Sequence, residues 1–258
     1  MVGTNAALQP KIILILSFFF AILYSMKLSP QEIIVLLKKH YPQAKMILQW
    51  GNHFELLVAI ILSAQCTDVM VNKVTAKLFP KYKQPRRDFE ERSTYEMDTQ
   101  KISLPKEEII ELINLASVPI EELEQDIKST GFYRNKAKNV QAAAKVVLEK
   151  YHGSLPRTIA ELIIIPGVGR KTANVFLGNA YHIYEGIAVD THVTKQSQIL
   201  GLTKQTTPEK IEQDLMKQFE KEDWFPLTYL LIEHGRNMRK KKSDRSLCKD
   251  NTCILCTT

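Results

Sequence analysis

The amino-acid sequence predicts an all-α protein. The chain has 258 residues, of which 45% are hydrophobic, enough for a real core in one large domain or two modest ones. Apolar residues recur at intervals of three and four, as in Phe54, Leu57, Val58 and Ile61, which is the spacing of one helix face. Glycine is scarce, and little of the chain alternates apolar with polar residues as a strand does. We therefore expect helices throughout.

Each helix is predicted from its own pattern and end signals. Ser29 is placed to cap the first helix, with Pro30 at its first position. Asp68 is placed to cap the third helix, and Gly131 to end the fifth. Between the third and the fourth, residues 81–101 are polar, charged and without periodicity, as in a surface insertion. The predicted helices cover residues 27–40, 53–65, 68–79, 103–116, 119–131, 135–153, 158–165, 170–180, 207–220 and 225–235.

Residues 1–26 form a hydrophobic N-terminal extension. The 13 residues from Ile12 to Tyr24 are almost all apolar, which is short for a membrane span of about 20 residues. They have the length of a signal-peptide core, but no small-x-small cleavage pattern follows cleanly. We expect either a hydrophobic anchor or a chain whose functional beginning is Met26.

The charge balance and the cysteines bear on partners and compartment. The formal net charge is +7, from 35 Lys and Arg against 28 Asp and Glu. This favours a protein that binds a polyanion such as nucleic acid over one whose basic surface only contacts solvent. Cys66 stands alone in an apolar helical pattern and is expected to pack there. The other three cysteines crowd the last eleven residues, which is unlike a secreted disulfide framework.

A proline–glycine hairpin lies between two helical patterns in ELIIIPGVGRKTANV, residues 161–175. Glycines at positions 167 and 169 allow positive φ angles and a close approach of a ligand to the backbone. The helix that begins near Arg170 would point its free amides at an anion such as a phosphate. A P-loop is excluded because Ile164 stands where its first glycine is required. A plain helix–helix turn is the alternative.

Lys171 and Asp190 are the candidate catalytic pair. Asp190 lies in GIAVDTHV, 19 residues after the lysine. A lysine beside an apolar wall can lose its charge and become an amine nucleophile. A carboxylate beside it can transfer protons and stabilise a developing cation. The pair suits attack on a sugar C1′, and the alternative is a surface lysine with an aspartate that caps the helix beginning at Thr191.

Several motifs occur together in one order. They are LSAQCTDVMVNKVTAKLF, STGFYRNKAKNV, IPGVGRKTANVFLGNA, AVDTHV and LIEHGR. Between Ser29 and Arg236, apart from residues 81–101, the chain resembles the endonuclease III family of DNA glycosylase/AP lyases. The resemblance implies a two-lobed, all-α helix-hairpin-helix glycosylase fold with the DNA groove between the lobes. Residues 46–184 would form the helical barrel domain that contains the hairpin, and residues 27–45 and 185–258 the second helical domain.

The resemblance also implies the reaction. Lys171 would attack C1′, expel the damaged base and form a Schiff base, and β-elimination would then nick the strand 3′ to the lesion. Asp190 would assist, and the target nucleotide would be flipped out of the duplex. The implied substrate is an oxidised pyrimidine in duplex DNA.

Four residues are expected on the wall that faces the DNA bases. Gln65 matches the polar residue that fills the gap left in the base stack, and the alternative is a helix-terminal amide. Phe132 matches the apolar wedge on the opposite strand, and the alternative is a core aromatic. Ser63 and Asp68 would line the base pocket or only cap helices.

Other residues are expected along the DNA backbone. Gly167, Val168 and Gly169 would present amides to a phosphate, and Arg170 would contact the backbone or solvent. Lys240 belongs to a basic run, Arg236 to Lys242, that would face DNA, and a frayed basic tail is the alternative. His192 is expected to hydrogen-bond backbone rather than to catalyse.

The C-terminus departs from the family. Members usually hold a 4Fe–4S cluster with C-x6-C-x2-C-x5-C, and here Arg239 occupies the place of the first cysteine. Cys248, Cys253 and Cys256 provide three thiolates where the usual cluster has four. A zinc site with a remote histidine has weak support from the spacing. We expect no intact cluster and no cofactor.

Other functions stay open at this point. They are an abasic-site lyase, a glycosylase for thymine or uracil in mismatches, a non-catalytic helix-hairpin-helix DNA-binding module, and a membrane-tethered protein. The expected partner is double-stranded DNA that carries a damaged base or an abasic site, with no small-molecule cofactor. We expect a monomer that is intracellular and DNA-associated.

Overall fold

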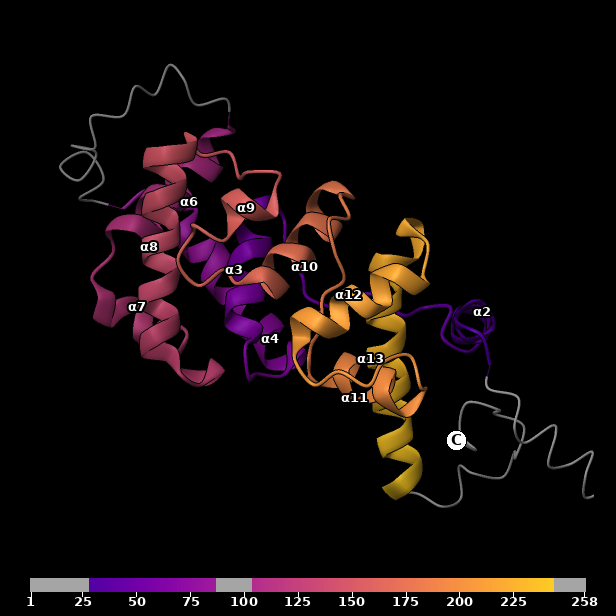
Figure 1. The fold of residues 1–258 in the computed structure, drawn as a ribbon. Coiled ribbons are helices and arrows are strands. Elements are labelled where there is room, and N and C mark those ends of the chain that lie inside the picture. The colour runs from indigo at the N-terminus through magenta and orange to yellow at the C-terminus, as the bar shows by residue number, and fades with distance from the viewer. Residues whose placement is uncertain (1–27, 87–103, 244–258) are drawn as a thin grey trace, which may run out of the picture.

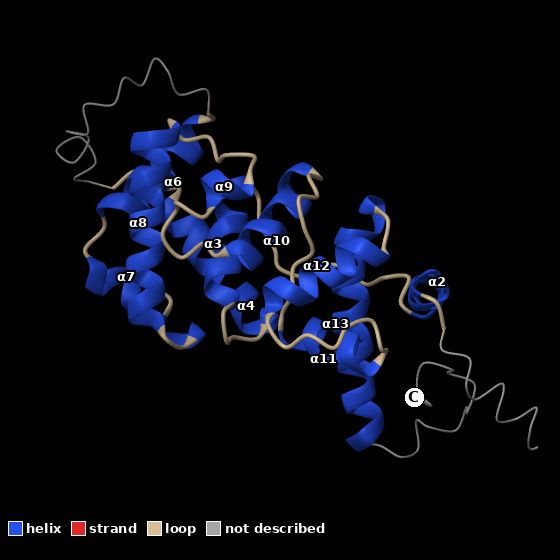
Figure 2. Ribbon diagram, viewed as in Figure 1, coloured by secondary structure: helices blue, strands red, loops and turns tan. Residues whose placement is uncertain are grey.

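The structure, a computed structural model, describes residues 28–86 and 104–243. Within these two ranges every regular element is a helix (Figure 1; Figure 2). The helices are α2 (Pro30–His40), α3 (His53–Ser63), α4 (Asp68–Tyr82), α6 (Lys106–Ser117), α7 (Ile120–Asp126), the 3₁₀ turn η2 (Lys128–Thr130), α8 (Tyr133–Tyr151), α9 (Ile159–Leu162), α10 (Arg170–Tyr181), α11 (Thr191–Ile199), α12 (Pro208–Gln218) and α13 (Lys221–Ser243). The predicted all-α class is therefore confirmed.

The helix starts follow local capping chemistry, with one correction. Ser29 forms a capping box with Glu32: its side chain accepts from the Glu32 amide, and the Glu32 carboxylate accepts from the Ser29 amide at 2.8 Å. At α4 the N-cap is Thr67, whose hydroxyl accepts from the Met70 amide at 3.3 Å. The prediction that Asp68 caps α4 is wrong, because Asp68 is the first residue inside that helix.

Two hydrophobic clusters organise the described residues. The first is built from α3, α4 and α6 to α10, and its members fall between Leu48 and Leu177. The second is built from α2, α11, α12 and α13, together with Ile187 and Val189. Figure 1 shows α6, α7 and α8 at one end of the molecule and α11, α12 and α13 at the other, with α3 and α10 between them. The exact domain boundaries, at residues 45/46 and 184/185, stay a prediction.

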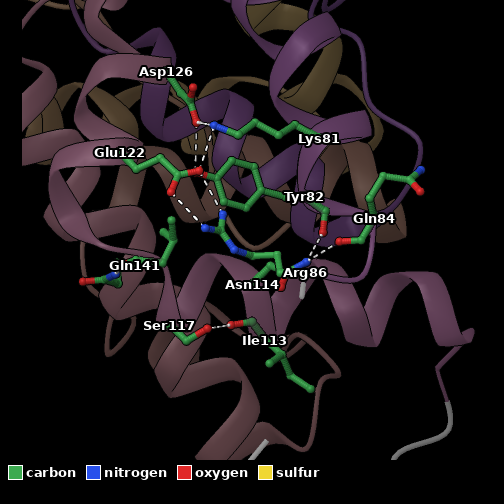
Figure 3. Close-up of polar contacts among 11 residues, drawn as sticks. Lys81, Tyr82, Gln84, Arg86, Ile113, Asn114, Ser117, Glu122, Asp126 and Gln141 are labelled. Carbon is green, nitrogen blue, oxygen red and sulfur yellow. Dashed lines mark hydrogen bonds and ion pairs between the residues drawn. The ribbon is translucent and has the colours of Figure 1, made fainter. Parts of the chain in front are cut away.

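A polar network fixes the chain before residue 87 (Figure 3). Arg86 donates to both oxygens of Glu122, at 2.9 and 3.0 Å, and this pair holds the pKa of the Glu122 carboxyl low, at about 2. Lys81 contacts Glu122 at 3.0 Å and Asp126 at 2.6 Å, and Tyr82 also donates to Asp126. These contacts join the end of α4 to α7. The predicted insertion thus begins inside α4, and its residues 87–101 lie outside the described ranges.

None of the helices in the described ranges combines the length and the apolar composition of a membrane span. The apolar run from Ile12 to Tyr24, for which an anchor or a late functional start was considered, lies outside those ranges.

Candidate active site

A cavity of about 910 Å³ lies where the two clusters meet. It is lined from the α3–α4 junction, from the first turns of α10 and α11, and from α13. These elements belong to different clusters, so the cavity exists only because the two packing units come together. Of the predicted site residues it brings together Ser63, Gln65, Asp68, Lys171, Asp190 and His192.

Asp190 is held in place by the helix that it caps. Its Oδ1 accepts hydrogen bonds from the amides of His192 and Val193, both at 2.8 Å, at the start of α11. Both bonds use the same oxygen, so Oδ2 has no hydrogen bond to any described residue. Capping and chemistry are therefore compatible, because one oxygen holds the carboxylate in place and the residue lines the cavity.

Lys171 is the second residue of α10 and is exposed at the cavity. The apolar wall that the sequence led us to expect is partly present, since Val175 and Val189 also line the cavity. This wall does not enclose Lys171, whose side chain is exposed. Lys171 and Asp190 come from different helices and line the same cavity, but their roles stay a prediction.

Gln65 and Phe132 share an unusual backbone. Each has a positive φ, +52° for Gln65 and +48° for Phe132, in the left-handed region that residues with a Cβ rarely adopt. Both side chains are exposed, and Phe132 is 67% exposed. This exposure removes the alternative that Phe132 is a core aromatic. Left-handed backbone also occurs at His152 and His182, which are helix C-caps, whereas Gln65 lies at the cavity and Phe132 at the start of α8, outside the cavity lining.

The two glycines of the hairpin differ in whether the fold has room for a side chain at their position. Gly167 has φ +82°, and a Cβ there would lie 2.9 Å from the Cβ of Asn139, so the fold itself requires glycine. Gly169 has φ −92°, and a Cβ there would meet nothing within 4 Å. Val168 is buried, and its amide donates to Ile165 O at 3.1 Å, so this amide serves the turn. The open space beside Gly169 is where a ligand can approach the backbone.

Arg170 has a protein partner. Its Nε and Nη2 donate to the Glu212 carboxylate at 2.6 and 3.2 Å. Glu212 is buried and also accepts from Asn174 Nδ2 and from the amide of Ile187. This network ties the first turn of α10 to α12, across the two clusters. Arg170 remains 49% exposed, so its contact with DNA stays a prediction beside this structural role.

Ser63 and Asp68 also have internal partners. The Ser63 hydroxyl donates to Ile60 O at 2.8 Å, at the end of its own helix. Asp68 forms an ion pair with Arg236 of α13 at 3.0 Å, which again joins the two clusters along the cavity. Lys240 belongs to α13, but its side chain lies outside the described residues.

Sequence reasoning missed Lys136, which is only 5% exposed. Its amine donates to Leu62 O and to Thr130 O, each at 2.8 Å. A pattern could have revealed it, because Lys136 precedes Val140 and Ala144 at helical spacing and so falls on the buried face of α8.

Comparison with known proteins decides the family. Residues 58–221 match the model of the HhH-GPD superfamily base excision DNA repair proteins. The chain belongs to this superfamily. Endonuclease III of Synechocystis sp. is 43% identical over 212 residues, which cover 82% of this chain and 84% of the relative. The predicted resemblance to the endonuclease III family is therefore confirmed.

Solved structures agree with this assignment. A trapped endonuclease III–DNA covalent intermediate aligns with a TM-score of 0.66 and 41% identity, over 81% of this chain and 87% of the other. A non-covalent endonuclease III–DNA complex aligns with a TM-score of 0.69 and 39% identity, over 88% and 94%. This member of the superfamily is a base excision repair DNA glycosylase/AP lyase, and its partner is duplex DNA.

The expectation that no cofactor is needed requires correction. Endonuclease III homologues carry a 4Fe–4S cluster. A count of three cysteines could not exclude one, because histidine replaces cysteine in some iron–sulfur centres. Cys248, Cys253 and Cys256 lie outside the described ranges. Residues 28–86 and 104–243 contain no group of His, Cys, Asp or Glu that could hold a metal, so they do not by themselves form a cluster site.

Proposed function

We propose that this protein excises oxidised pyrimidines from duplex DNA with Lys171 as the nucleophile and Asp190 as its acid–base partner. The observation that carries the proposal is the cavity between the two clusters, which has both side chains and Gln65 on its wall. An amine on one wall and a fixed carboxylate on the other suit a reaction that makes and then breaks a bond at a sugar carbon.

The proposed chemistry has two stages. First, the Lys171 amine attacks C1′ of the flipped nucleotide, and the bond from C1′ to the base breaks, so the base leaves with that electron pair and takes up a proton. Loss of the ring oxygen from C1′ then gives an imine between Lys171 and the sugar. Asp190 accepts the proton that the ammonium loses and stabilises the cationic imine.

In the second stage the strand is cut. A proton is removed from C2′, the bond between C3′ and its oxygen breaks, and the 3′ phosphate leaves with that electron pair. Water then hydrolyses the imine and returns the free amine of Lys171. Nothing is oxidised or reduced, so the chain's own side chains and water balance the reaction.

The remaining predicted residues would prepare the DNA. Gln65 would enter the gap that the flipped nucleotide leaves, and Phe132 would wedge into the opposite strand. The backbone beside Gly169 would contact a phosphate, because the start of α10 provides free amides and nothing covers that position. With duplex DNA as its partner, we propose an intracellular, DNA-associated location.

Borohydride trapping tests the proposed nucleophile. The full chain is incubated with a duplex that contains one abasic site, and borohydride reduces any imine to a stable protein–DNA adduct. We expect an adduct with the wild type and none with Lys171→Gln. Lys195→Gln changes an exposed lysine outside the cavity, and it should trap as the wild type does. An adduct that persists in Lys171→Gln would refute the assignment.

Asp190→Asn tests the carboxylate with little effect on the fold. An asparagine oxygen can still accept the two amide bonds that cap α11, because Asn is as good an N-cap as Asp. We expect excision to slow by about a hundredfold or more while the melting temperature stays near that of the wild type. Single-turnover assays on duplexes with thymine glycol, uracil opposite guanine, or an abasic site then separate the oxidised-pyrimidine glycosylase from a mismatch glycosylase and from a lyase alone.

A further inference from the structure

Two loops beside the first hydrophobic cluster bear the exposed residues with left-handed backbone, Gln65 and Phe132, that would enter the DNA. Gln65 lies two residues beyond the end of α3, and Phe132 lies between η2 and α8. A left-handed backbone at a residue with a side chain persists only where the surrounding structure holds it. A contact with the rest of the protein must therefore hold each loop in its conformation and hold the two loops at a fixed separation.

The amine of Lys136 is the contact that the two loops share. It donates to Leu62 O, three residues before Gln65, and to Thr130 O, two residues before Phe132. Both distances are 2.8 Å, and the lysine is buried. Since Lys136 belongs to the first turns of α8, the helix, the end of α3 and the η2 turn converge on one nitrogen.

The backbone at the end of α3 explains why a side chain is needed there. In a continuing helix the amide of Cys66 would donate to Leu62 O, but here it donates to Ser63 O at 3.1 Å, because the chain turns left-handed at Gln65. Lys136 supplies a donor to the Leu62 carbonyl in its place. A buried carbonyl without a donor is costly, so this bond supports the strained turn directly.

The second loop is held in the same manner. The amides of Thr130 and Gly131 donate back to Ile127 O and Lys128 O, which closes the η2 turn, while Thr130 O points to Lys136. Phe132 follows at once with its left-handed backbone. Burial lowers the pKa of the Lys136 amine, and its bonds to two carbonyls stabilise the charge that remains.

We propose that Lys136 is a positioning residue for base extrusion, which sets the spacing between Gln65 and Phe132 so that both enter the duplex together. It touches neither DNA nor the reacting atoms. The inference rests on the proposed functions of Gln65 and Phe132 and adds a residue that those functions require. A nucleotide is then displaced from the duplex only when the loops that carry Gln65 and Phe132 are held at this spacing.

Lys136→Met removes the donors and keeps the length of the side chain. Lys150→Met is the matched control, because Lys150 is an exposed lysine of the same helix at its far end. The substrate is a duplex with thymine glycol opposite 2-aminopurine, whose fluorescence rises when that base leaves the stack. We expect single-turnover excision by Lys136→Met to fall about a hundredfold, since a displacement near 1 Å has effects of that size, with a reduced fluorescence change. Lys150→Met should match the wild type.

A second substrate separates positioning from general damage to the fold. In a duplex with an abasic site opposite another abasic-site analogue, there is no base to extrude and no opposite base to wedge apart. Strand cleavage there by Lys136→Met should stay within about threefold of the wild type. If the wild-type protein does not cleave this substrate, the proposed function is wrong. A Lys136→Met variant equal to the wild type on both substrates would overturn only the present inference.

Two further tests keep the proposal falsifiable if Lys136→Met folds poorly. Lys136→Arg retains donors and charge but has a longer, planar head, so it should fold and show an intermediate loss on the thymine glycol duplex only. In the wild-type background, Gln65→Ala and Phe132→Ala should be strongly non-additive, because the two side chains act as a unit. Wild-type excision by a folded Lys136→Arg, or additive effects of the two alanine substitutions, would refute the proposal.

Discussion

We predict that buried Glu111 makes a contribution to the stability of the fold that is lost as the pH rises. The side chain, in α6, is 1% exposed; its Oε2 accepts from Asn52 Nδ2 at 2.9 Å, and its Oε1 has no hydrogen-bond partner within the described ranges. Burial raises the pKa of this carboxyl to about 7. The hydrogen bond from Asn52 lowers that pKa, the nearby buried Glu55 raises it, and Lys83, which is paired with Glu55 at 2.6 Å, lowers it to a smaller extent.

The sign and the size follow from proton binding. Between the ordinary value of 4.5 and the folded value of about 7, the folded protein holds a proton on Glu111 that the unfolded chain has released. The contribution of Glu111 to the free energy of unfolding is therefore complete below pH 4.5 and is lost as the pH rises through 7. At 1.36 kcal/mol per pKa unit the whole change is about 3 kcal/mol, of which about 2.5 kcal/mol falls between pH 5 and pH 8.

Urea unfolding at pH 5 and pH 8 measures this change. In Glu111→Gln the side chain is neutral at both pH values, so its loss of stability between them should be smaller than that of the wild type by about 2.5 kcal/mol. Glu107→Gln, at an exposed position of the same helix, should keep the wild-type difference. Equal pH dependence in the wild type and Glu111→Gln would show that Glu111 is ionised in the folded protein at both pH values.

The hairpin, the first residue of α10 and Phe132 give four further predictions. Gly167→Ala should lower the free energy of unfolding by about 1–3 kcal/mol, because the left-handed backbone and the close neighbour both oppose a Cβ. Gly169→Ala should change the free energy of unfolding by no more than about 0.5 kcal/mol but weaken DNA binding in fluorescence anisotropy. Unchanged DNA binding by Gly169→Ala would contradict a phosphate contact there. Arg170→Met should cost about 2 kcal/mol in urea unfolding, because buried Glu212 loses its cation; no loss would mean that the pair is only a surface contact. Phe132→Ala should keep the melting temperature, because the ring is exposed, and slow excision about tenfold in single turnover; a lowered melting temperature with normal excision would reverse the assignment.

Local chemistry made much of the helical framework predictable. The Ser29 capping box at α2 depends on residues within one turn, so the sequence alone is sufficient to locate it. The predicted helix over 158–165 shows the limit: α9 ends at Leu162, and Ile163 and Ile164 are exposed. Their apolar character continues the helical pattern, but the chain has already begun to turn toward Pro166, and apolar type alone does not report burial.

The candidate site was predictable where a motif brings its own chemistry. The hairpin, Lys171 and Asp190 could be named because each stands in a short segment with a recognisable pattern, and the structure places the last two on one cavity. Helical spacing indicates only that Lys136 is buried. Its acceptors, Leu62 O and Thr130 O, are backbone groups of other segments, so no pattern of side chains reveals its role.

Arg170 shows what such long-range contacts contribute to the site. It stands next to Lys171, and the sequence suggested a contact with DNA or solvent; the structure pairs it with Glu212, 42 residues away. Glu212 also accepts from the amide of Ile187, three residues before Asp190. The buried Glu212 carboxylate is thus bonded to Arg170, the neighbour of Lys171, and to the segment that leads to Asp190. Lys171 lies on α10, which packs in the first cluster, and Asp190 caps α11, which packs in the second. Packing within either cluster therefore cannot set their separation, and the Glu212 carboxylate is a direct link that can. The relative placement of the two groups is therefore a property of the interface between the clusters, where the cavity lies.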